Sequence, residues 1–180
     1  MFGIADKPRP QAARAIQHLK KLGVHTLMVT GDTEQTTHYI AGKVGIETVI
    51  ANARPEDKLA IIRQFQKDGK KVGMTGDGIN DAPALAAADV GFAMGTGTDI
   101  AIESADMTLV HGDITKVTEA IQLSTGTIRI IKQNLFWAFG YNVVAIPVAA
   151  MGKLNPMIAS AAMALSSVSV IVNSLRLGKK

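Results

Sequence analysis

The chain has 180 residues, a formal net charge of +4 and no cysteine. Its basic residues are scattered rather than massed, so nucleic acid is not an expected partner, and neither a disulfide nor a thiolate metal site exists within it. Charged residues recur every few positions up to Gln133, whereas Lys153 is the only charged residue from Asn134 to Leu175. This change in composition divides the chain into a charged first part and an apolar second part.

The first part alternates short apolar strands with helices. Helices are expected to begin near Pro10, Thr33 and Lys58, where helix-starting residues precede apolar positions with helical spacing. The alternation is typical of a parallel, doubly wound, Rossmann-like sheet in an α/β fold. The expected strands are residues 24–29, 48–50, 72–74, 89–94 and 107–110.

A turn with two carboxylates, an amide and two glycines follows the strand at residues 72–74. Asn80 or Asp81 is well placed as the N-cap of the next helix, and Gly76 and Gly78 are expected to take positive φ and approach a ligand closely. Asp77 and Asp81 supply the hard oxygen ligands that Mg²⁺ prefers, with phosphate and water as its other ligands. The alternative is a solvated turn that uses these residues only for its geometry.

Two other motifs offer groups that bind phosphate. Thr30-Gly31-Asp32 follows the strand at residues 24–29, and Lys58 lies at the start of a helix. Because ligands bind at the carboxyl ends of parallel strands, we expect Thr30, Lys58 and the Asp77/Asp81 turn to converge on one phosphate. Thr30 would hydrogen-bond a phosphoryl oxygen and Lys58 would neutralise its charge. Taken singly, Thr30 also fits a plain strand end, and Lys58 a solvated helix residue.

In this order the motifs resemble those of the phosphorylation domain of P-type ATPases, cation pumps of the haloacid-dehalogenase-like superfamily. The resemblance rests on Thr75–Asp81 and Arg54–Lys58, and extends through Gly95–Asp99 and Glu103–Asp106. It implies ATP as the substrate and an aspartyl-phosphate intermediate. The implied site consists of Asp77 and Asp81 on Mg²⁺, Asn80 in support, and Thr30, Gly31, Asp32 and Lys58 around the phosphoryl group.

One motif of that family does not occur in the chain. The phosphorylated aspartate lies in an Asp-Lys-Thr-Gly-Thr string before an inserted nucleotide-binding domain, and here Asp6-Lys7 is followed by Pro-Arg. We therefore expect the chain to start after that insertion and, in isolation, to be inactive. In the family, the strand with this aspartate lies between those that correspond to residues 24–29 and 72–74. Without that central strand, the facing edges of the strands at residues 24–29 and 72–74 would either stay unpaired or pair directly with each other.

Two apolar segments dominate the second part. Residues 133–152 and 155–175 are each close to the roughly 20 residues that span hydrocarbon, so we predict a transmembrane α-helical hairpin. Residues 1–112 would be the incomplete phosphorylation domain and 113–132 a linking helix. Basic residues flank the hairpin on both sides, which indicates a multi-pass integral membrane protein with both ends of the chain cytoplasmic. A pair of buried helices in a non-membrane protein is the alternative.

Polar and sulfur-containing residues within these segments indicate a metal. Met163 and Ser167 are four residues apart and share a helical face, and a thioether sulfur with hydroxyl and amide oxygens nearby suits Cu(I). Methionine as a gap filler and serine bonded to its own helix are the alternatives.

The two segments are also similar to the last two membrane helices of copper(I)-exporting P-type ATPases. The similarity rests on Tyr141-Asn142 with Pro147, Asn155-Pro156, Met163–Ser167 and Asn173–Arg176. It implies that Tyr141, Asn142, Met163 and Ser167 bind Cu⁺, in a site completed by a Cys-Pro-Cys of an earlier helix that this chain lacks.

The sequence therefore predicts part of a pump that couples ATP hydrolysis to export of Cu(I). Its expected partners are the lipid membrane, the remainder of the pump and, through that pump, a copper chaperone. A non-catalytic, membrane-tethered module that binds Mg²⁺ and phosphate, or that regulates a full pump, is the alternative. A free-standing phosphatase is disfavoured because the chain offers no nucleophile.

Overall fold

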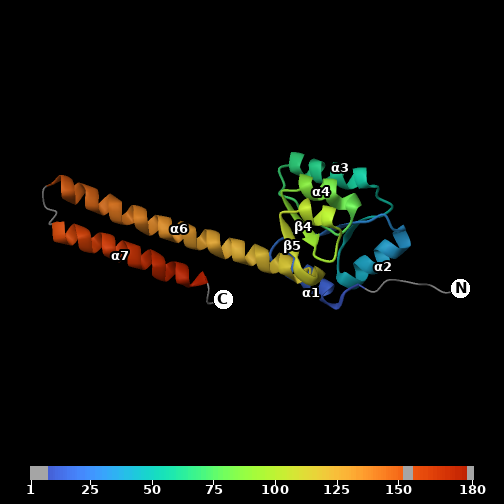
Figure 1. The fold of residues 1–180 in the computed structure, drawn as a ribbon, viewed down its shortest axis with the longest axis horizontal. Helices are drawn as coiled ribbons and strands as arrows, with labels where there is room; N and C mark the ends of the chain where they lie inside the picture. The colour runs from blue at the N-terminus through green and yellow to red at the C-terminus, as the bar shows by residue number, and fades with distance from the viewer. Residues whose placement is uncertain (1–7, 152–155, 178–180) are drawn as a thin grey trace. The chain divides into compact units, whose positions relative to one another are not determined.

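A computed structural model describes residues 8–151 and 156–177 (Figure 1). The chain divides into two compact units, residues 1–119 and 120–180. The first unit holds short helices and strands, and most of the second is helical. In chain order the first unit contains α1 (Pro10–Lys21), β1 (Leu27–Val29), α2 (Glu34–Val44), β2 (Thr48–Ile50), α3 (Pro55–Lys67), β3 (Gly73–Gly76), the 3-10 turn η1 (Ile79–Asp81), α4 (Ala82–Ala87), β4 (Val90–Met94), α5 (Asp99–Glu103), β5 (Met107–Leu109) and η2 (Val110–Gly112).

The strands of the first unit pair only in parallel, in two groups. β1 pairs with β2, with Leu27 opposite Thr48, and β4 lies between β3 and β5. Each parallel pair needs a crossover, and short helices supply them. The predicted alternation and parallel pairing are therefore confirmed. Among the described residues, no ladder joins β1 to β3, so of the two alternatives the inner edges of these strands stay unpaired with each other.

The core of this unit surrounds β4. Phe92 and Ala93 of β4 are buried with Ala84 and Leu85 of α4 and with Ala101 of α5. Figure 1 shows α4 and β4 together in the green and yellow part of the ribbon. Because η1 and α4 follow β3 directly, burial of α4 against β4 fixes the turn that holds the predicted magnesium ligands.

A carboxylate at the start of β4 ties three elements together. Asp89 Oδ1 lies 2.7 Å from Lys71 Nζ, and Asp89 Oδ2 accepts hydrogen bonds from the Val72 amide at 3.0 Å and the Gln66 side chain at 3.2 Å. The ammonium of Lys71, then the Val72 amide, then Gln66, lower the pKa of Asp89 from 3.8 to about 2. The end of α3, the start of β3 and the start of β4 are thereby joined at one ionised group.

Two long helices follow, α6 (Thr115–Ala150) and α7 (Pro156–Leu175). α6 is one continuous helix, so the predicted linking helix and first apolar segment are not separated by a break. Amide side chains join the two helices: Asn173 Nδ2 donates to Asn134 Oδ1 at 2.9 Å, and Asn134 Nδ2 donates to Ser174 Oγ at 2.9 Å. Residues 152–155, where the first predicted apolar segment ends and the second begins, lie outside the described residues.

The apolar character of α6 and α7 was the basis for the predicted membrane spans. Across residues 8–151 and 156–177, no helix combines the length and the apolarity needed to cross a membrane. The helices themselves are confirmed by the structure, whereas the transmembrane assignment stays a prediction.

Candidate functional site

An ion pair between α3 and the turn after β3 is at the centre of the site. Lys58 Nζ donates to Asp81 Oδ1 at 2.6 Å, and the two side chains are only 18% and 11% exposed. Asp81 occupies the N-cap position of α4, as predicted, but its side chain makes no capping hydrogen bond there. Its carboxylate is committed to Lys58, a residue 23 positions earlier.

The two glycines of this turn do not act as the sequence predicted. Positive φ occurs among the described glycines at Gly23, Gly45, Gly69 and Gly112, so the prediction of positive φ at Gly76 and Gly78 is wrong. The turn brings Asp81 back against the backbone of Gly76. A Cβ placed at Gly76 would lie 2.7 Å from Asp81 Cβ, so a side chain there would collide with Asp81. The backbone at Gly76 is therefore closely approached by the side chain of Asp81.

The loop after β4 supports the turn from another side. The Thr98 amide donates to Asp77 O at 3.0 Å, and a Cβ at Gly97 would lie 2.6 Å from the same oxygen. Gly97 is a site residue that sequence reasoning missed: the Gly-rich stretch from residue 94 to 98 was visible, but its contact with Asp77 was not. The loop therefore fixes the backbone of Asp77.

The side chains of Asp77 and Asn80 are accessible to solvent. Both residues are exposed, and the Asp77 carboxylate takes no ion pair or hydrogen bond from the part of the chain that the structure describes. A fixed backbone with a free, hard oxygen donor suits a hard cation such as Mg²⁺.

The motif after β1 forms a second small cluster. Thr30 Oγ1 donates to Asp32 Oδ2 at 3.0 Å and accepts from the Asp32 amide at 3.2 Å. The Ala53 amide donates to Thr30 O at 2.9 Å, and the Asn52 amide to Asp32 O at 2.8 Å. Gly31 is exposed beside Ala53 O. The loop that carries Thr30–Asp32 is therefore bound to the segment that leads into α3.

α3 connects the two clusters without merging them. The segment before α3 hydrogen-bonds to the Thr30–Asp32 loop, and Lys58 in the first turn of α3 forms the ion pair with Asp81. Within the described ranges, no side-chain hydrogen bond or ion pair links Thr30 or Asp32 to Lys58, Asp77 or Asp81. Convergence of these residues on one phosphate stays a prediction.

The turn after β3 offers two carboxylates as ligands for Mg²⁺. No cluster of three or more His, Asp or Glu side chains able to hold a metal occurs in the described part of the chain. Mg²⁺ commonly uses one or two protein carboxylates and completes its shell with phosphate and water, so two carboxylates suffice. Asp77 is the free donor, and Asp81 shares its charge with Lys58.

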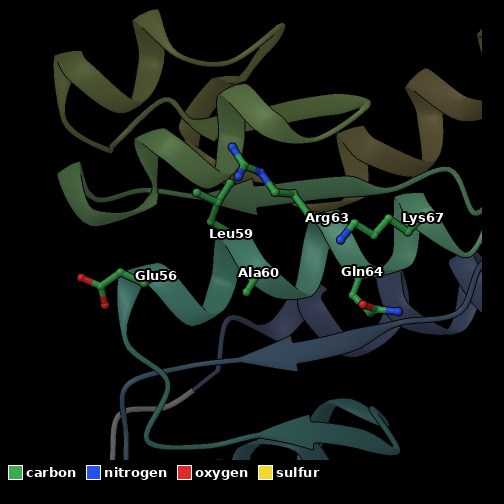
Figure 2. A pocket seen from close by; sticks show the side chains of 6 residues that line it. All are labelled: Glu56, Leu59, Ala60, Arg63, Gln64 and Lys67. Atoms are coloured by element: carbon green, nitrogen blue, oxygen red, sulfur yellow. The ribbon is translucent and has the colours of Figure 1, made fainter.

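A shallow hollow on α3 does not belong to this site. Figure 2 shows its lining side chains spread along the helix from Glu56 to Lys67. The lining combines an acidic residue with two basic ones and includes none of the predicted site residues. Its members are Glu56, Leu59, Ala60, Arg63, Gln64 and Lys67.

The four predicted copper ligands lie on two helices. Tyr141 and Asn142 belong to α6, and Met163 and Ser167 to α7. Met163 is 75% exposed, and Ser167 Oγ donates to Met163 O at 3.2 Å, the helix-internal bond that was the alternative interpretation. Among the described residues, no side-chain hydrogen bond joins the α6 pair to the α7 pair, so a copper site also stays a prediction.

The parallel α/β unit matches one class of protein. Two family models, both described as haloacid dehalogenase-like hydrolase, match residues 1–89 and 58–121. The first unit therefore has the haloacid dehalogenase-like α/β fold, as the motifs indicated.

Relatives in this class are ion pumps. A copper-exporting P-type ATPase of Staphylococcus haemolyticus is 58% identical over 177 residues, which are 98% of this chain and 22% of that protein. One of Staphylococcus aureus is 54% identical over 179 residues, 99% of this chain and again 22% of the relative. The chain thus spans about a fifth of the length of these relatives.

Solved structures of heavy-metal pumps are also similar. A zinc-transporting PIB-type ATPase in its E2.Pi state is 37% identical with a TM-score of 0.87, over 96% of this chain and 28% of that one. The catalytic domain of the CPx-ATPase CopB-B is 41% identical with a TM-score of 0.62, over 67% of this chain and 48% of that one. The chain is therefore similar, over nearly its whole length, to part of a P-type ATPase.

Proposed function

We propose that the chain is part of a P-type ATPase that couples ATP hydrolysis, through an aspartyl phosphate, to export of Cu(I). The observation that carries the proposal is the enclosed Lys58–Asp81 pair at 2.6 Å, together with the exposed carboxylate of Asp77, four residues before Asp81, which has no ion pair or hydrogen bond among the described residues. Support for copper as the ion comes from the sequence relatives, which are 54–58% identical, whereas the zinc-transporting pump is 37% identical.

Each group of the turn has a defined task in this proposal. Asp77 holds Mg²⁺, which when bound offsets the charge of a transferring phosphoryl group. Lys58 presents its ammonium to the phosphoryl oxygens, and Asp81 fixes the position of that ammonium. Thr30 turns its hydroxyl from Asp32 to a phosphoryl oxygen, and Asn80 supports the site from its exposed position.

The second unit belongs to the membrane part of the pump in this proposal. The apolar part of α6, from residue 133 onward, and α7 lie in the lipid bilayer, with both ends of the chain on the cytoplasmic side. Tyr141, Asn142, Met163 and Ser167 contact the transported Cu⁺. The remainder of the pump supplies the phosphorylated aspartate and the nucleotide domain, and a copper chaperone delivers the ion to it. This 180-residue chain alone forms no phosphoenzyme.

A chimeric pump tests the proposal. The chain replaces the matching segment of the Staphylococcus haemolyticus relative, and acid-stable phosphoenzyme is measured with radiolabelled ATP in the presence of Cu(I). The chimera is expected to form the phosphoenzyme, and Asp77→Asn to abolish its Mg²⁺-dependent formation because a hard anionic ligand is lost. Asp68→Asn is the matched control, since Asp68 is an exposed carboxylate at the end of α3.

Three results would contradict parts of the proposal. Near-normal phosphoenzyme in the Asp77→Asn chimera removes Asp77 from the site. An inactive chimera beside an active parent rejects the catalytic role and favours a non-catalytic module. Acid-stable labelling of the isolated chain refutes its expected inactivity.

A further inference from the structure

The second unit carries charge of only one sign. Residues 120–180 contain six basic residues and no Asp or Glu. Two of the six, Arg129 and Lys132, lie on α6 immediately before the uncharged stretch that starts at Asn134. A partner that covered these two cations would need to bring negative charge to them.

Arg129 and Lys132 line a shallow groove on one face of α6. Both side chains are exposed, and within residues 8–151 and 156–177 neither forms an ion pair or a hydrogen bond. The groove is lined by Thr125, Ile128, Arg129, Lys132, Gln133, Phe136 and Trp137, and we call it the Arg129–Trp137 groove.

Aromatic rings form the end of the groove that faces the apolar stretch. Phe136 and Trp137 are 69% and 54% exposed, and their rings meet edge to face with centroids 5.7 Å apart. Tyr141 lies one helical turn further along α6, and its ring centroid is 6.5 Å from that of Trp137. Along α6, cations are followed by aromatic rings and then by aliphatic residues. A phospholipid has the matching order of phosphate, glycerol and acyl chain.

We propose that the Arg129–Trp137 groove binds an anionic phospholipid. The guanidinium of Arg129 and the ammonium of Lys132 pair with the headgroup phosphate, while the rings of Phe136 and Trp137 contact its glycerol and upper acyl chain. The inference rests on the proposed function in one respect, namely that α6 lies at a membrane. It adds a lipid class and a binding site to that function.

Charge favours a lipid over a protein helix in this groove. A helix that covered Arg129 and Lys132 would remove two cations from water, which is costly unless each receives an acidic partner. A free phosphate ion would pair with the cations but would leave the exposed Phe136 and Trp137 uncovered. An anionic phospholipid satisfies both halves of the groove.

Trp137 provides a reporter within the site because it is the only tryptophan of the chain. The full chain is reconstituted in vesicles of phosphatidylcholine and phosphatidylglycerol, with brominated acyl chains on one lipid or on the other. Bromine quenches tryptophan fluorescence at short range. We expect brominated phosphatidylglycerol to quench Trp137 more strongly at equal mole fraction, with a preference of about fivefold per cation and roughly thirtyfold for the pair.

Two double variants, each of which removes two positive charges, distinguish an effect of the groove from an effect of net charge. Arg129→Gln with Lys132→Gln is expected to equalise quenching by the two brominated lipids. Arg63→Gln with Lys67→Gln removes the same charge from the hollow on α3 (Figure 2) and is expected to keep the preference. Both double variants replace exposed side chains, and circular dichroism verifies that their helices are retained.

The outcomes distinguish this inference from the proposed function. Equal quenching by both brominated lipids in the unmodified chain overturns the lipid site and leaves α6 in the membrane. Quenching by neither overturns the membrane placement and, with it, the site. A preference lost equally in both double variants assigns the effect to net charge and overturns the groove as its location.

Discussion

Gly76→Ala tests whether the turn after β3 is built on contact between Gly76 and Asp81. The added Cβ would lie 2.7 Å from Asp81 Cβ and 2.8 Å from Asp81 Oδ2. Asp81 has no room to move aside, because it is 8% exposed and Lys58 holds its other carboxylate oxygen at 2.6 Å. Either the ion pair breaks or β3 shifts away from η1.

The magnitude follows from overpacking at an enclosed site. Extra carbon in a packed interior destabilises by about 1–3 kcal/mol. Gly42→Ala is the matched control: Gly42 lies inside α2, and its added Cβ would meet no heavy atom within 4 Å. Alanine inside a helix stabilises by about 0.5–1 kcal/mol relative to glycine. The two variants make the same chemical change and are expected to act with opposite signs.

Hydrogen exchange measures the effect where it arises. Exchange of amides in peptides that cover β3 to α4 reports the free energy of local opening. A loss of about 1–3 kcal/mol corresponds to exchange roughly 5-fold to 150-fold faster in Gly76→Ala. In Gly42→Ala the peptides of α2 should exchange more slowly. Unchanged exchange at β3 and α4 in Gly76→Ala would refute the account of this glycine.

Three further substitutions test the Lys58–Asp81 ion pair, the Asp89 carboxylate and the predicted copper ligand Met163. Lys58→Met leaves the Asp81 carboxylate enclosed without its partner, so urea denaturation should show a loss of about 3 kcal/mol; an unchanged midpoint would mean that the pair is not enclosed in solution. The pKa of Asp89 is lowered from 3.8 to about 2, so its stabilising contribution is present above about pH 4 and is lost as the pH falls toward 2. Asp89→Asn should therefore make the urea midpoint depend less on pH across this window. An equal change of the midpoint with pH in both proteins would contradict the assignment. Met163→Leu keeps volume and apolarity but deletes the sulfur, so in the chimeric pump it should abolish Cu(I)-stimulated phosphorylation with little loss of folding, whereas unchanged turnover would make Met163 a packing residue.

Local chemistry in the sequence was enough to predict the elements of the fold. The strand at residues 48–50 and the start of α2 after Thr33 lie where an apolar run and a helix-starting residue indicated them. Strand alternation with helices predicted parallel pairing because a parallel pair requires a crossover. These features depend on residues close together in the chain, which is why the sequence alone determined them.

The site needed the tertiary structure, because its decisive contacts join residues far apart. Lys58 and Asp81 were both singled out, yet assigned to phosphate and to Mg²⁺ rather than to each other, since nothing in the spacing of 23 residues predicts their contact. Gly76 was identified for the wrong reason: its backbone is ordinary, and only the folded turn brings Asp81 against it. The open gap between β1 and β3 was one of two alternatives until strand pairing excluded closure among the described residues. Local periodicity fixes a helix or strand, but packing alone decides which carboxylate meets which ammonium.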